Sequence, residues 1–316
     1  MQISQFEALL ARVNKPARYI DGEWNAVHKD WEAARVRLAL LYPDVYEVGM
    51  SHLGLQILYH VVNSHPDYLA ERCYAPWTDM EAELRRAGAP LTSLESRRPL
   101  SDFDVIGITL PYELTYTNVL NMLDLAGIPP RAADRTDDHP LVIGGGPGAA
   151  NPEPMADFID LFLPGDGEEI IVEFARFLRE AKAAGAARED IILEAARQIG
   201  GLYAPSYYAP QYDAEGRLRS IQPTAEGLPE RVRASKVADI ESASFPPAPI
   251  VPFVETVHDR ITLEIMRGCT RGCRFCQAGM LRRPVRPRSI GQLCRLAEQS
   301  YRSTGYDEIA LASLSS

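Results

Sequence analysis

The 316-residue sequence lacks any run of about 18 consecutive apolar residues, so we expect no transmembrane helix. Its opening stretch, MQISQFEALLARVNKPARY, carries acidic and polar side chains where a signal peptide needs an apolar segment. It also lacks internal repeats with a period of about 20–50 residues and has no low-complexity tract. These absences predict a cytoplasmic globular protein without a membrane partner, and the 46% hydrophobic content is ordinary for a chain that buries a core.

Positive charge is in short supply, because 33 Lys and Arg stand against 43 Asp and Glu and give a formal net charge of −10. This balance disfavours non-specific binding of the whole molecule to nucleic acid or to an anionic membrane. Cysteine is scarce as well: the chain has five, and three of them fall within eight residues. This distribution does not resemble a secreted disulfide framework, and we interpret the three clustered cysteines as metal ligands.

Between about residues 34 and 184 the sequence alternates strand-like and helix-like segments. The strand-like runs are short and apolar, and they are VRLALLY (36–42), the run near 69–74, DVIGITL (104–110), PLVIGGG (140–146) and FIDLFLPGDGEE (158–169). Helical patterns separate them, as in WTDMEAELRRAG, where Trp77, Met80 and Leu84 share one face and Gly88 is a plausible C-cap. Five strands alternating with helices predict an α/β fold with a doubly wound, five-stranded parallel sheet.

The pattern divides the chain into four segments, which are an N-terminal helical extension (1–33), the sheet domain (34–186), a hairpin with a Pro-rich connector (187–258) and a second α/β region (259–316). Tyr-rich segments around an AEG turn in residues 201–221 predict the hairpin. The prolines of FPPAPIVP indicate the connector. RITLEIMRG then begins a new strand that leads directly into the three clustered cysteines.

The cysteine cluster lies in RGCTRGCRFCQAG (267–279), which places Cys269, Cys273 and Cys276 at a C-x3-C-x2-C spacing with Phe275 before the last cysteine. A structural zinc site or an ordinary iron–sulfur cluster needs a fourth ligand. Three thiolates on a [4Fe–4S] cluster instead leave one iron with an open coordination position. Catalytic metal sites keep such a position for a substrate or cosubstrate.

Three other residues are candidates for a fourth ligand: Cys294, Cys73 and His258. We interpret Cys294 as a buried helix residue that acts as a small hydrophobe, because it follows Leu293 in an apolar helical pattern. Cys73 falls at a strand end in the sheet domain, and we expect it in the core. His258 precedes its strand and should lie at the strand end far from the cysteines. The sequence therefore predicts a three-cysteine site.

CTRGCRFC resembles the C-x3-C-x2-C motif of the radical S-adenosylmethionine (SAM) enzymes, including the aromatic residue. The resemblance implies a [4Fe–4S] cluster on Cys269, Cys273 and Cys276, with the amino and carboxylate groups of SAM on the fourth iron and Phe275 near SAM. It further implies an electron donor of the flavodoxin or ferredoxin type, whose electron cleaves SAM to methionine and a 5′-deoxyadenosyl radical. The expected context, an apolar strand before the cysteines and a helix after them, is present.

The sheet domain resembles the cobalamin-binding domain that precedes the SAM barrel in a large class of radical SAM proteins, and nearly the whole chain looks like an uncharacterised bacterial family of that kind. GITLPYELTYTNVL, the glycines after the fourth strand and PGDGEE carry this resemblance. It implies a set of residues lining the corrin and its nucleotide tail, which are Thr109, Leu110, Gly144, Gly145 and Gly146. All follow the carboxyl ends of strands, where open sheets bind ligands. The glycines also begin a G-x-G-x-x-A pattern, but Pro147, Pro152 and Pro154 oppose the prompt helix that an NAD site needs, so we reject NAD binding.

One departure from the cobalamin family concerns its cobalt-ligating histidine, which lies in a D-x-H-x-x-G motif. Here MSHLGL holds His52, with Met50 and Leu55 at the Asp and Gly positions. We interpret His52 as a capping or surface residue. Either cobalamin binds without a histidine ligand, or the domain has kept the fold and lost the cofactor.

Seven arginines and no acidic residue occur from Arg267 to Arg288. They indicate either a charge environment for an anionic cluster or a site for an anionic substrate, RNA among them. The resemblance predicts a radical SAM enzyme of unknown substrate, with cobalamin-dependent methyl transfer as one outcome. One alternative is a methylthiotransferase acting on tRNA or rRNA, whose family has three further cysteines where this sequence offers Cys73. Another is a noncatalytic iron–sulfur binding or regulatory module.

A radical SAM barrel would need about six strand–helix units, and residues 260–316 hold the start of one. We therefore expect the chain to be an N-terminal fragment that is inactive alone. Its sheet domain should be stable by itself, whereas residues 260–316 should be frayed, prone to aggregation or completed by further sequence.

Overall fold

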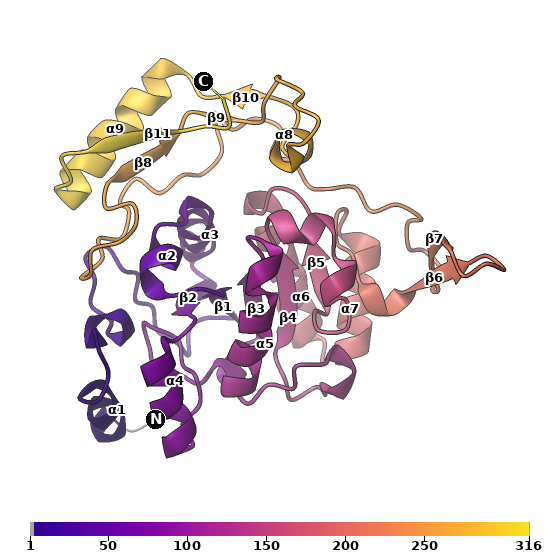
Figure 1. The fold of residues 1–316 in the computed structure, drawn as a ribbon, viewed down its shortest axis with the longest axis horizontal. Coiled ribbons are helices and arrows are strands. Elements are labelled where there is room, and N and C mark those ends of the chain that lie inside the picture. The colour runs from indigo at the N-terminus through magenta and orange to yellow at the C-terminus, as the bar shows by residue number, and fades with distance from the viewer. Residues whose placement is uncertain (1–2, 316) are drawn as a thin grey trace.

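The structure, a computed structural model, describes residues 3–315. Its largest element is a five-stranded parallel sheet with strand order β2-β1-β3-β4-β5 (Figure 1). The strands are β1 (Val36–Tyr42), β2 (Tyr68–Tyr74), β3 (Val105–Thr109), β4 (Leu141–Gly145) and β5 (Leu161–Leu163). The order reverses between β1 and β3, as in doubly wound sheets. The predicted five-stranded parallel sheet is confirmed.

Helices cover both faces of this sheet. On one face lie α3 (Leu53–Asn63), α6 (Glu168–Ala183) and α7 (Arg188–Gln198), and on the other lie α4 (Thr78–Ala87) and α5 (Tyr116–Leu125). Strand β1 shows the division, because Leu38 and Leu40 belong to the first core while Ala39 and Leu41 belong to the second. Side chains alternate between the two faces of a strand, so a strand covered on both sides must be apolar throughout.

The ends of α4 test the helix prediction in detail. Gly88 caps the helix with φ of 58°, and its N–H donates to the carbonyls of Leu84 and Arg85, as the sequence predicted. Trp77, expected on the buried face, is instead the N-cap residue and is 48% exposed. It lies before the first helical residue, so the helical periodicity does not govern its direction.

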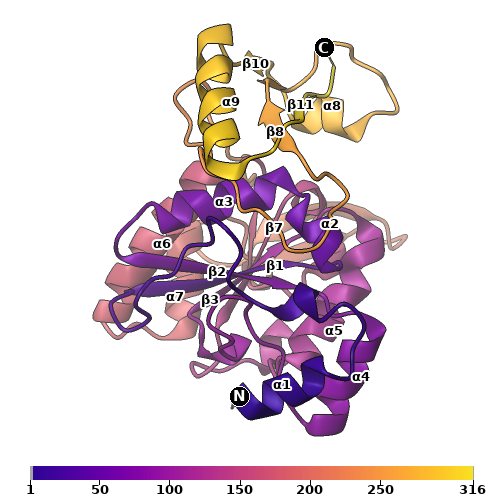
Figure 2. The same ribbon diagram turned by 90° about the vertical axis from the view of Figure 1, so that its left-hand side faces the viewer.

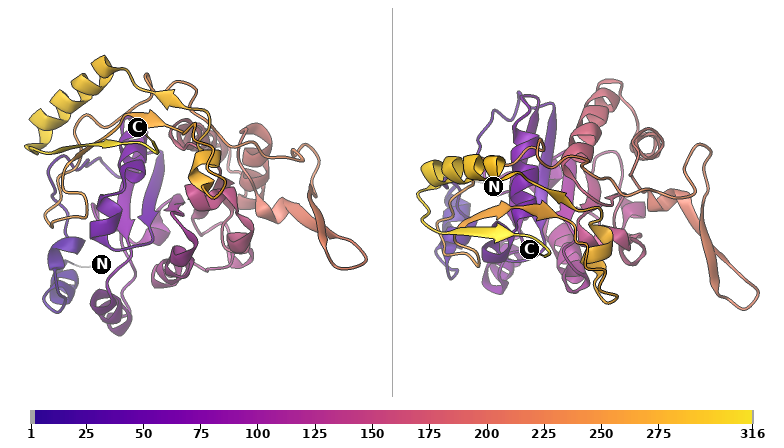
Figure 3. Two further views of the ribbon diagram at one scale, coloured as in Figure 1. Left: turned by 45° about the horizontal axis from the view of Figure 1, so that its top comes forward. Right: turned by 90° about the horizontal axis from the view of Figure 1, so that it is seen from above.

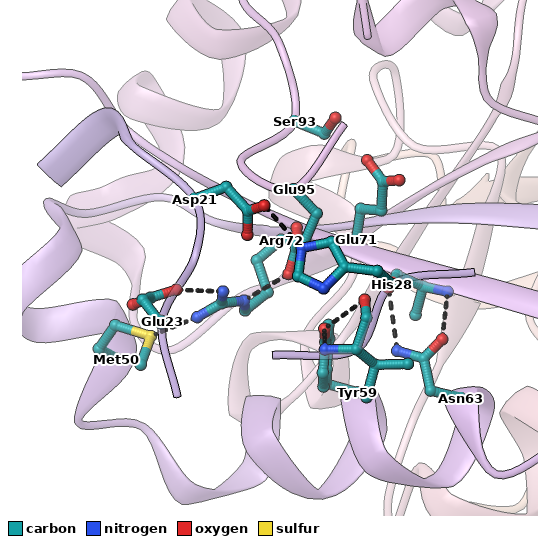
Figure 4. A network of polar contacts seen from close by, with 12 residues as sticks. Asp21, Glu23, His28, Met50, Tyr59, Asn63, Glu71, Arg72, Ser93 and Glu95 are labelled. Atoms are coloured by element: carbon teal, nitrogen blue, oxygen red, sulfur yellow. Dashed lines mark hydrogen bonds and ion pairs between the residues drawn. The ribbon is translucent and has the colours of Figure 1, made fainter. Parts of the chain in front are cut away.

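The N-terminal segment contains α1 (Ile3–Leu10) and a 3₁₀ turn (Pro16–Tyr19), and the rest of its described residues up to 33 form extended chain and turns. A buried ion network fixes it to β2 (Figure 4). The guanidinium of Arg72 binds Glu95 at 2.7 Å and Glu23 from the N-terminal segment, and Tyr46 donates its hydroxyl to Glu23. Removing one partner would leave a buried charge unpaired, so this network ties the segment firmly to the sheet.

Beyond α7 the chain forms smaller elements. The predicted hairpin is confirmed as the antiparallel pair β6 (Tyr208–Tyr212) and β7 (Leu218–Pro223), which projects from the body of the protein in Figure 1. The remaining elements are α2 (Tyr46–Met50) in the sheet domain and, after the connector, β8 (Ile261–Glu264), β9 (Met266–Arg267), α8 (Gln277–Leu281), β10 (Arg286–Pro287), α9 (Ile290–Thr304) and β11 (Ile309–Ala312).

Residues 259–315, here called the C-terminal module, contain one β-α-β unit in which β8 and β11 pair in parallel and α9 connects them (Figure 3). The short pair β9 and β10 brackets the cysteine segment. The module lies over one end of the sheet domain (Figure 2). The predicted radical SAM barrel stays a prediction, because a single β-α-β unit occurs both at the start of a barrel and in other α/β arrangements.

The position of Cys294 corrects an expectation from the sequence. Helix α9 buries Leu296 (5% exposed) against the core, with Leu293 partly buried beside it, whereas Cys294 is exposed. Successive residues are separated by about 100° around a helix, so the neighbour of a packed leucine can face solvent. Cys73, in contrast, is buried in the core as expected.

Among the helices that the structure describes, none is long and apolar enough to cross a membrane.

Candidate functional site

The carboxyl ends of the sheet strands border a cavity of about 480 Å³ between the sheet domain and the C-terminal module. Its floor consists of aliphatic side chains from four strands, which are Leu40, Ile108, Ile143 and Leu163. Met266, Ala278 and Leu314 line it from the side of the module. The cavity is large enough for a small-molecule ligand and is mostly apolar, with a few polar groups at its border.

Glycines form one wall of this cavity. Thr109, Gly144, Gly145 and Gly146 all line it, so the structure brings together four residues that the cobalamin resemblance implied. Gly146 has φ of 89°, and a Cβ atom there would lie 3.1 Å from the carbonyl oxygen of Leu110. This position therefore requires glycine, which leaves the backbone open to close approach by a ligand.

Leu110 departs from the expectation that it lines the same site. Its side chain is fully buried in the core and is not part of the cavity wall. Its N–H donates to the carbonyl of Gly145 and its own carbonyl accepts from Gly148 N–H at 2.9 Å. Leu110 supports the glycine wall from behind.

His52 also lines the cavity and caps α3, as the sequence predicted for a histidine at a helix start. Its Nδ1 accepts the backbone N–H of Leu55 at 3.1 Å, so the proton of the neutral ring resides on Nε2. Burial, together with the positive charge of Arg282, lowers the pKa of His52 to about 4. The ring is therefore neutral at pH 7 and offers an N–H donor. It has no free nitrogen lone pair for a metal while this cap is in place.

The cysteine segment begins at Gly268, directly after β9. Gly268 has φ of 90°, and a Cβ atom there would lie 2.5 Å from the carbonyl oxygen of Pro284. The backbone can make this close approach only with glycine, so the segment folds back at this point. Cys276 is the N-cap residue of α8, and its Sγ accepts the N–H of Gly279 at 3.3 Å.

The three cysteines differ in their surroundings. Cys269 is buried, Cys276 is half-buried and Cys273 is exposed. A hydrogen bond between Cys269 Sγ and Ser315 Oγ (3.5 Å), together with donation from Arg271 N–H (3.4 Å), holds the pKa of the Cys269 thiol below its usual value. A lowered pKa favours the thiolate, which is the form that ligates metals.

The donor set fits an iron–sulfur cluster, because three thiols lie within eight residues and two of them accept backbone N–H groups. In this conformation, no three Cys, His, Asp or Glu side chains of residues 3–315 surround a common metal position. Phe275, expected near SAM, is 93% exposed.

Most of the arginines in 267–288 are committed to acidic partners or backbone carbonyls rather than to open solvent. Arg267, Arg282 and Arg286 all bind Asp166, which follows β5 in the PGDGEE stretch. Arg267 also binds Glu168 and Glu264. We call these six residues the seam cluster, because they join the sheet domain to the C-terminal module. The seam cluster was not predicted from the sequence. The acidic PGDGEE loop and the arginine-rich segment 267–288 are the two features that could have indicated it.

A second cavity of about 480 Å³ lies beside the first, and Gly146, Pro147 and Arg282 border both. Tyr203 and Tyr208 line it near the base of the hairpin. The edge of the sheet therefore offers two adjacent compartments.

Comparison with known proteins identifies two similarities. Residues 54–205 match the model of a family described as radical SAM proteins, N-terminal. The chain is also 25% identical over 275 residues to the uncharacterized protein MJ0966 of Methanocaldococcus jannaschii, in an alignment that covers 87% of this chain and 48% of that protein. The chain thus spans about half the length of the curated relative it matches. The family match lies mostly within the sheet domain, and it supports a similarity of this part of the chain to the N-terminal part of radical SAM proteins.

Proposed function

We propose that this chain binds a [4Fe–4S] cluster through Cys269, Cys273 and Cys276 and takes part in reductive cleavage of SAM. The observation that carries the proposal is the C-x3-C-x2-C segment, which follows a β-strand and is flanked by Gly268 and Ala278, two residues that line a ligand-sized cavity. The match of residues 54–205 to the radical SAM family supports it independently, because that match does not include the cysteines.

The residues of the segment have separate tasks in this proposal. Cys269 provides a thiolate already favoured by its hydrogen bonds, and Cys276 provides one at the start of α8. Cys273 closes the set from the exposed turn. When bound, the cluster would supply an electron, received from a flavodoxin- or ferredoxin-type donor, that cleaves SAM to methionine and a 5′-deoxyadenosyl radical. Three protein ligands leave one iron for SAM.

We further propose that the apolar cavity at the carboxyl edge of the sheet accepts part of a cobalamin. Thr109 and the glycine wall would contact it there, since the wall lets a flat group approach the backbone. His52 would donate a hydrogen bond through Nε2–H and not ligate cobalt, because its Nδ1 is engaged with Leu55. Methyl transfer is then one outcome of the chemistry.

The cobalamin proposal is tested by the visible spectrum of the protein mixed with cobalamin. Wild type and His52→Ala should give the same cobalt spectrum. A different spectrum for the variant would show that His52 is a ligand, and failure of wild type to bind would leave only the fold in common with cobalamin domains.

The cluster proposal is tested by anaerobic reconstitution with iron and sulfide. We expect the iron content and the electron paramagnetic resonance spectrum of one oxygen-sensitive [4Fe–4S] cluster. The spectrum should change when SAM is added. Formation of 5′-deoxyadenosine with a strong reductant tests cleavage itself. A cluster that does not respond to SAM would favour the noncatalytic module, and absence of any cluster would refute the proposal.

The substrate class is suggested by charge at the cysteine segment. Arg271, Arg274 and Arg283 are exposed, and no ion pair to them occurs among the described residues. These three side chains are available to bind an anionic substrate, RNA included. The net charge of −10 opposes binding of such a substrate elsewhere on the surface. A methylthiotransferase is less well supported, because the sheet domain offers Cys73 alone and buries it.

A further inference from the structure

Asp166 occupies an unusual position in the seam cluster. It lies in the loop after β5, is only 4% exposed, and accepts hydrogen bonds from groups far away in the sequence. Arg286 Nη1 lies 2.5 Å from its Oδ2, while Arg267 and Arg282 lie 3.2 Å and 3.3 Å from its Oδ1. The backbone N–H of Val237, in the connector, donates to Oδ2 at 3.1 Å. One carboxylate therefore contacts three arginines of the C-terminal module.

These arginines flank the cysteine segment on both sides. Arg267 lies two residues before Cys269, and Arg282 lies six residues after Cys276. Asp166 therefore joins the two ends of the segment that carries the cysteines. Fixing both ends of a flexible segment restricts its conformations, so the segment needs to lose less entropy when it closes around a ligand.

Neighbouring carboxylates reinforce one of the two ends. Glu168 Oε1 accepts from Arg267 Nη2 at 2.7 Å, and Glu264 accepts from the same guanidinium at 2.8 and 2.9 Å. Arg267 is only 8% exposed, so these carboxylates surround its guanidinium away from solvent. A buried guanidinium with several carboxylate partners is held in one orientation, because each lost partner leaves charge uncompensated.

The loop that carries Asp166 is itself fixed in place. Its backbone N–H donates to the carbonyl of Ser235 at 2.8 Å, and Gly165 forms a parallel bridge with the same residue. At Gly165, φ is 104° and a Cβ atom would lie 2.1 Å from the Ser235 oxygen. The loop can approach the connector this closely only with glycine, so Asp166 is presented from a backbone with little freedom.

We propose that Asp166 is a positioning residue that holds the cysteine segment in place over the sheet edge by binding the arginines at both of its ends. This inference rests on the proposed function, because it concerns how the segment that would bind the cluster is held in position. The contacts themselves do not depend on a cluster. Asp166 acts through the arginines and is not a ligand of iron.

The main experiment uses cluster-free protein and the variant Asp166→Asn, which keeps the shape of the side chain and removes its charge. Trypsin cleaves after exposed Arg271 and Arg274 in the cysteine segment. We expect cleavage there to accelerate at least about tenfold in the variant, because loss of the buried carboxylate charge leaves the arginines at both ends of the segment without this partner. Hydrogen exchange of residues 268–281 should accelerate with it, while β1, β3 and β4 should stay as protected as in wild type.

Asp160→Asn is the matched control. Asp160 is equally buried, at 4% exposed, and it also binds two arginines, Arg135 at 3.0 Å and Arg188 at 2.5 Å. Neither of these partners belongs to the C-terminal module. This variant should lower the stability of the sheet domain but should not selectively accelerate hydrogen exchange at residues 268–281. It therefore distinguishes the general effect of losing a buried carboxylate from the specific effect of losing the contacts that position the segment.

Arg282→Gln provides a milder test if Asp166→Asn does not fold. Arg282 is partly exposed and contributes one contact to Asp166, so its loss should be tolerated. We expect a smaller acceleration of cleavage, of about two- to fivefold, in line with a partly exposed ion pair. The proposal is overturned if Asp166→Asn and Arg282→Gln are both cleaved, and both exchange hydrogen, at the wild-type rate. If Asp166→Asn does not fold, wild-type rates in Arg282→Gln alone overturn it.

A second measurement separates this inference from the proposed function. In reconstituted protein, iron should leave faster on addition of a chelator in Asp166→Asn than in Asp160→Asn. If wild type takes up no cluster, the proposed function fails, but the cleavage and exchange results still decide whether Asp166 positions the segment. If wild type binds a cluster and the variants release iron at equal rates, the positioning role is wrong.

Discussion

Two regions of this protein are built from the same β-α-β unit and bury it to very different extents. In the sheet domain, β1 and β3 are almost entirely buried between helices on both faces. In the C-terminal module, β11 pairs with β8 but leaves Ile309 44% exposed and Leu311 66% exposed. Parallel strands are usually covered on both faces. The comparison shows that local pattern decides which elements form, whereas neighbouring layers decide how much stability they gain.

The two regions also differ in how they use charge. The sheet domain encloses Arg72 with Glu23 and Glu95 inside its own structure. The C-terminal module directs its buried arginines outward to Asp166 and Glu168, which belong to the other region. Its attachment therefore combines ion pairs at the seam with apolar packing of β8 and α9 against the main core. Each of the following predictions tests one side of this contrast.

The largest effect is expected for the cysteines. Cys269→Ala, Cys273→Ala and Cys276→Ala should each abolish the reconstituted [4Fe–4S] cluster, because each removes one of its three thiolate ligands. Cys73→Ala and Cys294→Ala are the controls and should retain it. Iron content and electron paramagnetic resonance provide the measurement. Loss of the cluster in Cys294→Ala would mean that the site has a fourth protein ligand.

Thiol reactivity should separate the two regions next. Burial raises the pKa of the Cys73 thiol, so reaction with a thiol reagent requires the sheet domain to open. Cys273 and Cys294 are exposed and should react at once in cluster-free protein. We expect Cys73 to be slower by at least about a thousandfold. Mass spectrometry of timed samples measures this, and comparable rates would show that the sheet domain opens readily.

Core substitutions should show the same contrast in stability. Phe174 in α6 is fully buried, and Phe174→Ala should lower the free energy of unfolding of the sheet domain by about 3–5 kcal/mol, because it leaves a cavity. Leu311→Ala in β11 should change stability by less than about 0.5 kcal/mol, since most of that side chain already contacts solvent. Urea unfolding measures both. A large cost for Leu311→Ala would indicate that β11 is covered in solution.

A final effect, smaller than that of Phe174→Ala, concerns His52 at the border of the two regions. Its pKa is lowered from 6.5 to about 4, so between these values the unfolded chain binds a proton that the folded protein does not. Stability should therefore fall as the pH falls through this window, by up to about 3 kcal/mol. Tyr42 faces the ring, with centroids 5.0 Å apart, and Arg282 supplies the nearby positive charge.

His52→Asn provides the comparison for this pH effect, because Asn can still cap α3 but does not titrate. Unfolding of both proteins at pH 7 and pH 4.5 would show a smaller acid loss for the variant. An equal loss in the two proteins would mean that other groups cause it.

Much of this protein was accessible from its sequence, because short-range patterns determine strands, helix ends and metal-ligand spacing. Apolar runs predicted β1 and β3, and Gly88 ended α4 as expected. The spacing of Cys269 and its two partners predicts an iron–sulfur cluster, and this stays a prediction. These features depend on residues within one turn or one strand of each other, where the geometry of the backbone limits the alternatives.

Only the tertiary structure decided which long-range partners those elements meet. It buried Leu110 behind the glycine wall, exposed Cys294, and joined Asp166 to arginines about 100–120 residues away in the chain. Side-chain direction and ion pairing depend on which layers come together, and composition or periodicity does not specify this. The cavity and the seam cluster exist only because two separately patterned regions meet at the carboxyl edge of one sheet.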